Sequence, residues 1–246
     1  MIEHAILLSA GQGSRMLPLT AERPKCLIDF SGKSLIAWQI EMLARGGVKR
    51  IDVVTGFMTD MVDAHLAEID DPRVTITTVF NPFYKVADNL GSCWIARSAM
   101  DGDFLILNGD TLVSEEIVAR VQEGNNWPIA VTVDVKDAYD SDDMKVTRHP
   151  ATGRLDRIGK TLTAAESNAE SIGFLAFRGE GAALFREAVR AAMRTPEGVQ
   201  HWYLKVIDSL APTGKVGTLS IQGLGWGEVD FLNDVEAATR LTDTWV

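Results

Sequence analysis

The sequence predicts an α/β fold of three layers, with a mostly parallel, mixed sheet in the middle. Two observations carry this prediction. Short β-branched and aliphatic runs alternate with amphipathic helical patterns through the first half of the chain, which is typical of a parallel sheet covered by helices on both faces. The chain also has 246 residues, of which 46% are apolar, and this is enough to bury a sizeable core.

In the first half, four strand-like runs are separated by three helical patterns. Apolar residues on one stripe predict a helix over 34–46, and two further helices are expected near 58–69 and 92–100. The expected strands are 5–9 (AILLS), 50–55 (RIDVVT), 74–79 (VTITTV) and 103–110 (DFLILNGD). Sheets of this kind bind ligands beyond the carboxyl ends of their parallel strands, so we expect the chemistry in the loops that follow these runs.

After residue 126 the pattern changes to strand-like runs in succession, which predicts hairpins or a mixed extension of the sheet. The runs are 128–135, 143–149, 153–160 and 171–177; helices are expected near 181–193 and 199–210, a strand near 216–222 and a last helix after 231–234. No repeat or Pro/Ser-rich linker divides the chain, so we expect one domain over 1–246.

The net charge of −10 argues against a nucleic-acid or membrane partner, because both require a basic footprint. The N-terminal residues show neither a basic n-region nor an apolar run long enough for a signal peptide or span, so the expected location is the cytoplasm. The two cysteines and four histidines have no metal-ligand spacing. An apolar face on the two late helices could form a homodimer.

The stretch LSAGQGSRMLPLT follows the first apolar run and predicts a phosphate-binding loop. Ala10, Gly11 and Gly13 lie at the end of the first strand, and the N–H groups of a glycine-rich turn can surround phosphate oxygens. Met16 stands where a dinucleotide-binding loop has its third glycine, and the Gly-Lys-Ser/Thr of a Walker A loop is missing. Taken alone, the pattern is also explained by a tight strand-to-helix turn.

The whole string SAGQGSRMLPLT, followed by RPKCLIDFSGKSLIAWQI, resembles the signature of the nucleotidyltransferase superfamily, AAGxGxRxxPxT and then PKxLxxxxxxPLI. Ser34 departs from it by standing where the family usually has proline. The resemblance implies a GT-A or Rossmann-like domain that condenses a nucleoside triphosphate with a phosphorylated small molecule and releases pyrophosphate. It places Arg15 and Lys25 on the triphosphate as the catalytic cations, and it implies a nucleotide-binding half (1–126) and an acceptor-binding half (127–246).

Two negatively charged substrates require a divalent cation, and Mg²⁺ prefers carboxylates. The run LILNGD ends at Asp110, where this superfamily places a metal-binding aspartate that also touches the nucleotide. GEVDFLNDVEAA matches the superfamily's late acidic segment, with Asp230 at the corresponding position. For each aspartate alone, a helix cap or turn is the alternative explanation. The resemblance therefore implies Mg²⁺ held by Asp110 and Asp230.

The closer resemblance is to small bacterial phosphocholine and inositol-1-phosphate cytidylyltransferases, which implies CTP as the nucleotide. It is carried by DNLGSCWIAR (88–97), DDMKV (142–146), IGK (158–160) and QHWYLKVIDSL (200–210). By this resemblance, Asn89 and Ser92 face the nucleotide or the entrance for the acceptor, and Lys145 and Lys160 reach the acceptor phosphate.

Phosphocholine is the first acceptor predicted, because a quaternary ammonium is bound by aromatic faces with a carboxylate nearby. The candidates for these contacts are Trp94, Trp202, Tyr203 and Trp226, with Asp88 and Glu170 as charge partners. An inositol-1-phosphate or sugar-1-phosphate nucleotidyltransferase using CTP or UTP is the alternative, and aminoethylphosphonate-like acceptors stay open. A non-catalytic nucleotide-binding regulator and a nicotinamide oxidoreductase are the alternatives from other classes.

Overall fold

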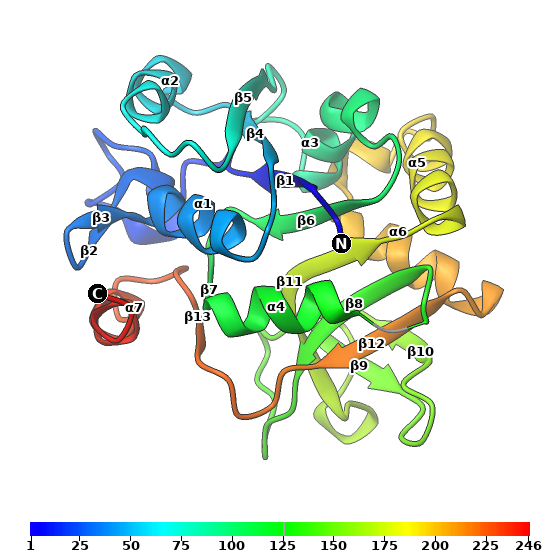
Figure 1. The fold of residues 1–246 in the computed structure, drawn as a ribbon. Helices are drawn as coiled ribbons and strands as arrows, with labels where there is room; N and C mark the ends of the chain where they lie inside the picture. The colour runs from blue at the N-terminus through cyan, green and yellow to red at the C-terminus, as the bar shows by residue number, and fades with distance from the viewer. Residues whose placement is uncertain (125) are drawn as a thin grey trace.

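The computed structural model of the protein describes residues 1–124 and 126–246, and a nine-stranded mixed sheet runs through it (Figure 1). The main path has the order β10-β9-β11-β6-β1-β4-β5, with β8 paired to β11 and β12 paired to β8. The strands are β1 (His4–Leu8), β4 (Arg50–Thr55), β5 (Thr75–Phe80), β6 (Phe104–Asn108), β8 (Ile129–Asp134), β9 (Lys145–Arg148), β10 (Leu155–Ile158), β11 (Ala169–Phe177) and β12 (Val216–Ser220). Two short ribbons accompany this sheet: β2 (Asp29–Phe30) with β3 (Lys33–Ser34), and β7 (Thr111–Val113) with β13 (Trp226–Glu228).

The strands β5, β4, β1 and β6 run parallel and form the half of the sheet that the first residues predict. In the central strand β1, Ala5 and Leu7 pack into one core cluster, whereas Ile6 and Leu8 pack into another. Successive side chains of a strand point to opposite faces, so β1 is buried on both sides. This double burial explains why AILL reads as a continuous apolar run.

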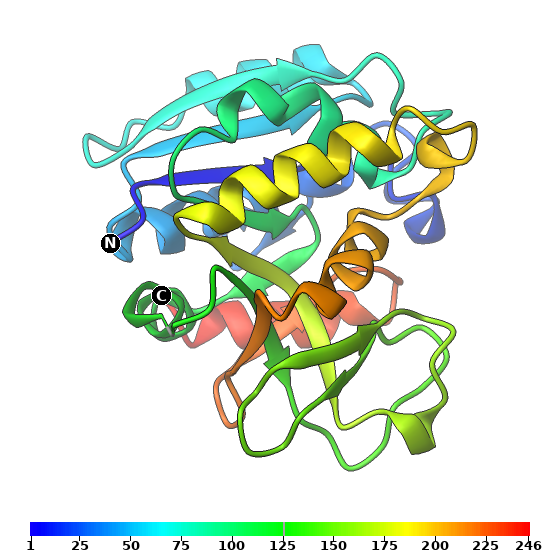
Figure 2. The ribbon, with the colours of Figure 1, turned by 90° about the vertical axis from the view of Figure 1, so that its right-hand side faces the viewer.

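Seven α-helices of the described residues cover the two faces. The helices α1 (Leu35–Arg45), α2 (Thr59–Ala67), α4 (Glu115–Glu123) and α7 (Asp234–Asp243) contribute to the first cluster, and α3 (Asn89–Ile95), α5 (Glu180–Ala192) and α6 (Tyr203–Leu210) to the second. Figure 2 shows α5 lying across the face of the sheet that is turned to the viewer. The arrangement of helices, sheet and helices confirms the predicted three-layer α/β class.

The strand β11 connects the second half of the chain to the first. All nine of its residues are buried, and it runs antiparallel to β6, with Phe174 opposite Leu107. On its other edge it pairs with β8, where Leu175 lies opposite Val131, and near its start it pairs with β9. The strands after residue 126 therefore extend the same sheet, as their succession predicted.

Several elements differ from the expectations. Helix α4 was not predicted, although Ser114 caps it and its first turn is acidic; the ribbons β2–β3 and β7–β13 were not predicted either. The helix expected near 92–100 is α3 followed by the 3-10 turn Ala96–Ala99. The helix expected at 199–210 begins only at Tyr203, after a separate 3-10 turn over Gly198–Gln200.

The loops after β1 and β6 touch at the carboxyl end of the sheet. The N–H of Gly109 donates to the carbonyl oxygen of Leu8 at 3.1 Å, and a Cβ at this position would lie 2.4 Å from that oxygen. Glycine therefore lets the segment after β6 pass directly beside the glycine-rich loop. This approach brings Asp110 to the loop that carries the predicted phosphate-binding residues.

Candidate active site

The glycine-rich loop turns sharply at Gly13, which has a left-handed φ of 73° and precedes the 3-10 turn Ser14–Met16. The hydroxyl of Thr20, seven residues further along the chain, donates to the Gly13 carbonyl at 2.9 Å and stabilises the turn. A Cβ at Gly13 would lie 2.8 Å from the Cβ of Lys25. Both the left-handed φ and the short distance to Lys25 favour glycine at position 13. The backbone of the loop therefore packs directly against the side chain of Lys25.

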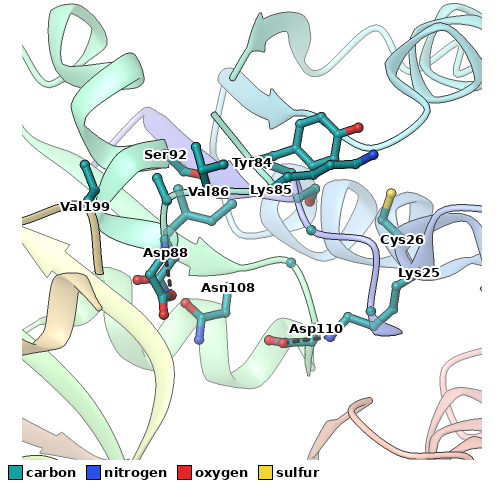
Figure 3. Close-up of a pocket in the computed structure, with 18 of the residues that line it drawn as sticks. Lys25, Cys26, Tyr84, Lys85, Val86, Asp88, Ser92, Asn108, Asp110 and Val199 are labelled. Atoms are coloured by element: carbon teal, nitrogen blue, oxygen red, sulfur yellow. Dashed lines mark hydrogen bonds and ion pairs between the residues drawn. The ribbon is translucent and has the colours of Figure 1, made fainter. Parts of the chain in front are cut away.

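Lys25 connects the two aspartates that the sequence assigns to a metal. Its Nζ donates to Asp110 Oδ2 at 2.9 Å and to Asp230 Oδ1 at 3.0 Å, and Figure 3 shows it turned toward Asp110. Arg15 donates to the other oxygen of Asp230 at 2.6 Å. Burial acts to lower the pKa of Lys25, but the charges of Asp110 and Asp230 outweigh it and hold the pKa above its usual value.

The structure adds a third carboxylate, Glu228, that sequence reasoning missed. One oxygen each of Asp110, Glu228 and Asp230 lies within 4.8 Å of the others. Glu228 is at the end of β13, opposite Thr111 of β7. The N–H of the following residue, Val229, donates to the carbonyl oxygen of Asp110 at 2.9 Å. The available signal was GEVD, in which a second acid stands two residues before Asp230, but the short ribbon that positions Glu228 is not predictable from its composition.

These three carboxylates fit a divalent cation by their own geometry. Oδ1 of Asp110 is buried and has no hydrogen-bond partner among the described residues, which leaves an unpaired acceptor on one of the three carboxylates. Removal of Glu228 from water, together with the charges of Asp110 and Asp230, raises its pKa to about 8. A bound cation would relieve this repulsion, and oxygen ligands of this kind are those that Mg²⁺ prefers.

A cavity of about 510 Å³ opens beside the loop (Figure 3). It is lined by all the residues predicted to bind the nucleotide: Ala10, Gly11, Gly13, Asn89, Ser92 and Asp110. Tyr84, Lys85 and Asn108, which the sequence did not indicate, line it as well. The walls come from the ends of β1 and β6, from the segment before α3, and from the turn before α6. This cavity is therefore the candidate nucleotide site.

The start of α3 is tied to the segment before α6 at the wall of this cavity. Asp88 caps α3 by accepting from the N–H of Asn89 at 2.7 Å, and burial raises the pKa of Asp88. The side chain of Asn89 accepts from the N–H of Tyr203 at 2.9 Å, and Asn81 donates to Ser92 at 3.1 Å. These bonds orient polar groups of α3, and the bond between Asn89 and Tyr203 joins positions more than a hundred residues apart.

A second cavity, of about 430 Å³, shares Asp88, Asn89, Asn108 and Asp110 with the first. The predicted acceptor residues Lys160, Glu170, Trp202 and Trp226 line it, and so do Arg15, Glu228 and Asp230. The acidic cluster with Lys25 and Arg15 thus lies where the two cavities meet. A ligand in one cavity can approach a ligand in the other at that point.

A family model described as nucleotidyl transferase matches residues 4–158, more than half of the chain. This chain belongs to the nucleotidyl transferase family. The resemblance that the glycine-rich loop and the PKC segment carry is confirmed, as is the expected enzyme class. None of the helices within residues 1–124 and 126–246 of this nucleotidyltransferase combines the length and apolar composition needed to cross a membrane.

The nucleotidyltransferase is also similar to proteins named as cytidylyltransferases. It is 25% identical to the CTP:phosphoglutamine cytidylyltransferase of Campylobacter jejuni, over 95% of this chain and 98% of that protein. Its fold is similar to that of the inositol-1-phosphate CTP transferase of T. maritima (TM-score 0.80, 19% identity, 98% of this chain and 97% of that chain). It is similar to the CTP:phosphocholine cytidylyltransferase of Streptococcus pneumoniae as well (TM-score 0.79, 19% identity, 98% and 100%).

The structure does not bring two of the aromatic residues predicted to bind the acceptor to the second cavity of this nucleotidyltransferase. Trp94 lines neither cavity, and the guanidinium of Arg97 lies 3.8 Å from the centre of its ring. Tyr203 is fully buried and donates its hydroxyl to Asn108 at 3.1 Å. As a correction to the prediction, these two rings belong to the packing behind the site.

Lys145, which is predicted to bind the acceptor phosphate, does not line the second cavity either. It is 3% exposed, and its ammonium donates to the carbonyl oxygens of Asp140 at 2.6 Å and Asp143 at 3.2 Å. The ammonium is therefore used in holding the loop between β8 and β9. The predicted contact of Lys145 with the acceptor phosphate is corrected accordingly, and Lys160 is the predicted lysine that does line the cavity.

Proposed function

We propose that this nucleotidyltransferase uses CTP and Mg²⁺ to transfer a cytidylyl group to a phosphorylated small molecule, with release of pyrophosphate. The observation that carries the proposal is the meeting of Lys25, Arg15 and three carboxylates at the junction of two cavities. The names of the similar cytidylyltransferases support CTP as the nucleotide. The two cavities give the donor and the acceptor separate places.

In the proposed reaction, an ionised phosphate oxygen of the acceptor forms a bond to the α-phosphorus of CTP. The bond from that phosphorus to the bridging oxygen of the β-phosphate breaks, and pyrophosphate leaves. The attacking oxygen already carries charge at pH 7, so the protein needs to position and neutralise rather than remove a proton.

The chain's own residues have distinct roles in this proposal. Asp110, Glu228 and Asp230 would hold Mg²⁺, which supplies charge neutralisation on the triphosphate. Lys25, fixed beside Gly13, faces the phosphates, and Arg15 adds a second cation from the acceptor side. Gly11 and Gly13 bring backbone N–H groups to the same phosphates.

For the acceptor, phosphocholine is the first proposal, because Trp202, Trp226 and Glu170 line the second cavity. An inositol-1-phosphate or sugar-1-phosphate is the second candidate, since Asn89, Asn108 and Ser171 line the same cavity and suit the hydroxyls of a ring. We also propose that residues 1–126 mainly bind the nucleotide and residues 127–246 mainly bind the acceptor.

The proposal is tested by pyrophosphate release with Mg²⁺ in a matrix of CTP, UTP, ATP, GTP and dTTP against phosphocholine, aminoethylphosphonate, inositol-1-phosphate and glucose-1-phosphate. We expect release with CTP. Lys25→Ala should lower kcat by about 10²- to 10³-fold, the cost of losing one preorganised charge-stabilising donor.

Lys49→Ala is the matched control, because Lys49 is an exposed lysine whose partner is the surface residue Glu3. It should leave kcat unchanged. Full turnover by Lys25→Ala would remove the assignment of Lys25, and the absence of pyrophosphate release across the matrix would overturn the proposed function.

A further inference from the structure

Besides Asp88 and Asp234, four carboxylates outside the metal-binding cluster line the acceptor cavity. Asp140, Asp142 and Asp143 come from the loop between β8 and β9, and Glu170 comes from β11. We call these four residues the head-group wall. Asp140 and Asp142 are exposed to solvent, whereas Glu170 is 2% exposed, so the wall extends from open water to a buried carboxylate.

Glu170 has one oxygen paired with Lys136 and one oxygen that receives no donor from the part of the chain that the structure describes, and the carboxylate of Asp143 lies beside it. Its Oε2 lies 2.7 Å from Nζ of Lys136, which also binds Asp143 at 3.1 Å. Its Oε1 is buried and has no hydrogen-bond partner among the described residues. A buried acceptor without a donor is costly, so this oxygen is suited to a donor that a ligand brings.

Two aromatic rings of the same cavity already have a cation of the protein over one face, which leaves fewer faces for a quaternary ammonium. Lys160 Nζ lies 5.5 Å from the ring centre of Trp202, and the Arg15 guanidinium lies 4.9 Å from that of Phe231. Each of these rings therefore already faces a cation of the protein. Trp226 lines the cavity as well, with its Nε1 bound to Asp134 at 2.9 Å. A cage for a quaternary ammonium requires several open faces around one point.

Lys145 stabilises the shape of the head-group wall. Its buried ammonium donates to the carbonyl oxygens of Asp140 and Asp143, and the side chain of Asp143 accepts from the N–H of Asp140 at 3.0 Å. These bonds hold the loop on the cavity before any ligand arrives. A preformed acidic wall lowers the ordering cost of binding a cation.

We infer that the acceptor has a primary ammonium, rather than a quaternary one, at the end opposite its phosphate, and that this ammonium donates an N–H to Oε1 of Glu170. The inference rests on the proposed function, and it replaces phosphocholine, the first acceptor named there, with an acceptor whose ammonium is primary. A primary ammonium has three N–H donors and can pair with Glu170, whereas a trimethylammonium has none.

The test compares phosphoethanolamine with phosphocholine, which differ only in the three N-methyl groups, using CTP, Mg²⁺ and the full chain. We expect kcat/KM to be at least about ten-fold higher for phosphoethanolamine, the effect of one charge-assisted hydrogen bond. Equal or better use of phosphocholine, or preferential use of inositol-1-phosphate, would overturn the inference and leave the proposed function intact. If neither these acceptors nor those of the matrix above give pyrophosphate, the proposed function fails as well.

The variant Glu170→Gln tests whether the side chain of Glu170 causes the preference for phosphoethanolamine over phosphocholine. Glu170→Gln should lower kcat/KM for phosphoethanolamine about ten-fold and leave the KM for CTP unchanged, because an amide keeps the shape but loses the charge. Glu187→Gln, an exposed carboxylate on α5, is the control. An unchanged preference in Glu170→Gln would remove Glu170 from the assignment, and the wild-type comparison stands on its own if this variant fails to fold.

Discussion

Lys25, Asp110 and Asp230 illustrate which parts of a site can be predicted residue by residue. Their order and spacing match a known signature, and the structure joins them by hydrogen bonds of 2.9 and 3.0 Å. Glu228 could not be assigned in the same way, since its position depends on the pairing of β13 with β7. Lys145 is a residue whose role was predicted wrongly, because its ammonium binds backbone carbonyl oxygens. The position of a lysine in the sequence does not reveal whether its ammonium contacts a ligand or the backbone.

The pH dependence of acceptor binding is a prediction that belongs to Glu170. Burial raises the pKa of Glu170 to about 7, although Lys136 acts to lower it, and the charge of Asp143 adds to the rise. The other charged residues beside it in the sheet are Asp134 and Lys145. An acid with a raised pKa is protonated at pH 6 and ionised at pH 8, so the carboxylate needed for an ammonium appears over this range.

We therefore expect the KM for phosphoethanolamine to fall by about ten-fold between pH 6 and pH 8, as the ionised fraction rises from about one tenth to about nine tenths. Steady-state kinetics with saturating CTP measures this. Glu170→Gln provides the control, because its profile keeps the titration of the acceptor phosphate and loses that of the carboxylate. A wild-type profile parallel to that of the variant would contradict the prediction.

At the scale of elements, the turn at Gly13 connects local backbone conformation to catalysis. In Gly13→Ala, the left-handed conformation costs about 1–3 kcal/mol. The new Cβ would also displace Lys25, whose Cβ is 2.8 Å away. Because a displacement of about 1 Å costs about 10²-fold in rate, we expect kcat to fall by about that factor.

Steady-state pyrophosphate release and the thermal midpoint together measure this effect. Gly11→Ala is the matched comparison for stability, since a Cβ at Gly11 meets no atom within 4 Å and its φ is not left-handed. Equal midpoints for the two variants would show that the conformation of Gly13 stores no strain.

The elements predicted best were those whose pattern is local and strong. Strands β1, β4 and β6 and helix α1 were found within a residue or two, except that the run ending at Asp110 stops as a strand at Asn108. Helix α4 was overlooked despite a capping serine, two glutamates in its first turn and the buried residues Ile117, Val118 and Val121. The paired residues of β7 and β13 lie more than a hundred positions apart, and no local pattern predicts that pairing.

At the scale of the whole molecule, one sheet is shared by the proposed nucleotide-binding and acceptor-binding halves. The antiparallel pairing of β11 with β6 crosses from one half to the other, with Phe174 opposite Leu107, and both residues are fully buried. One core cluster includes Leu105 of β6 together with Ala176 of β11. Neither half can lose its structure without exposing apolar surface of the other.

We therefore expect the chain to unfold in urea in one cooperative transition, with far-UV circular dichroism and tryptophan fluorescence giving the same midpoint. Phe174→Ala should lower the free energy of unfolding by about 3–5 kcal/mol, because it leaves a cavity at the shared pairing. Phe174→Ala should lower the midpoints measured by circular dichroism and by tryptophan fluorescence by the same amount. Phe83→Ala is the control, since Phe83 is 51% exposed and its loss should change the midpoint little. Two separated transitions, or a shift confined to one signal, would mean that the halves fold independently and that the acceptor cavity depends on their docking rather than on the common sheet.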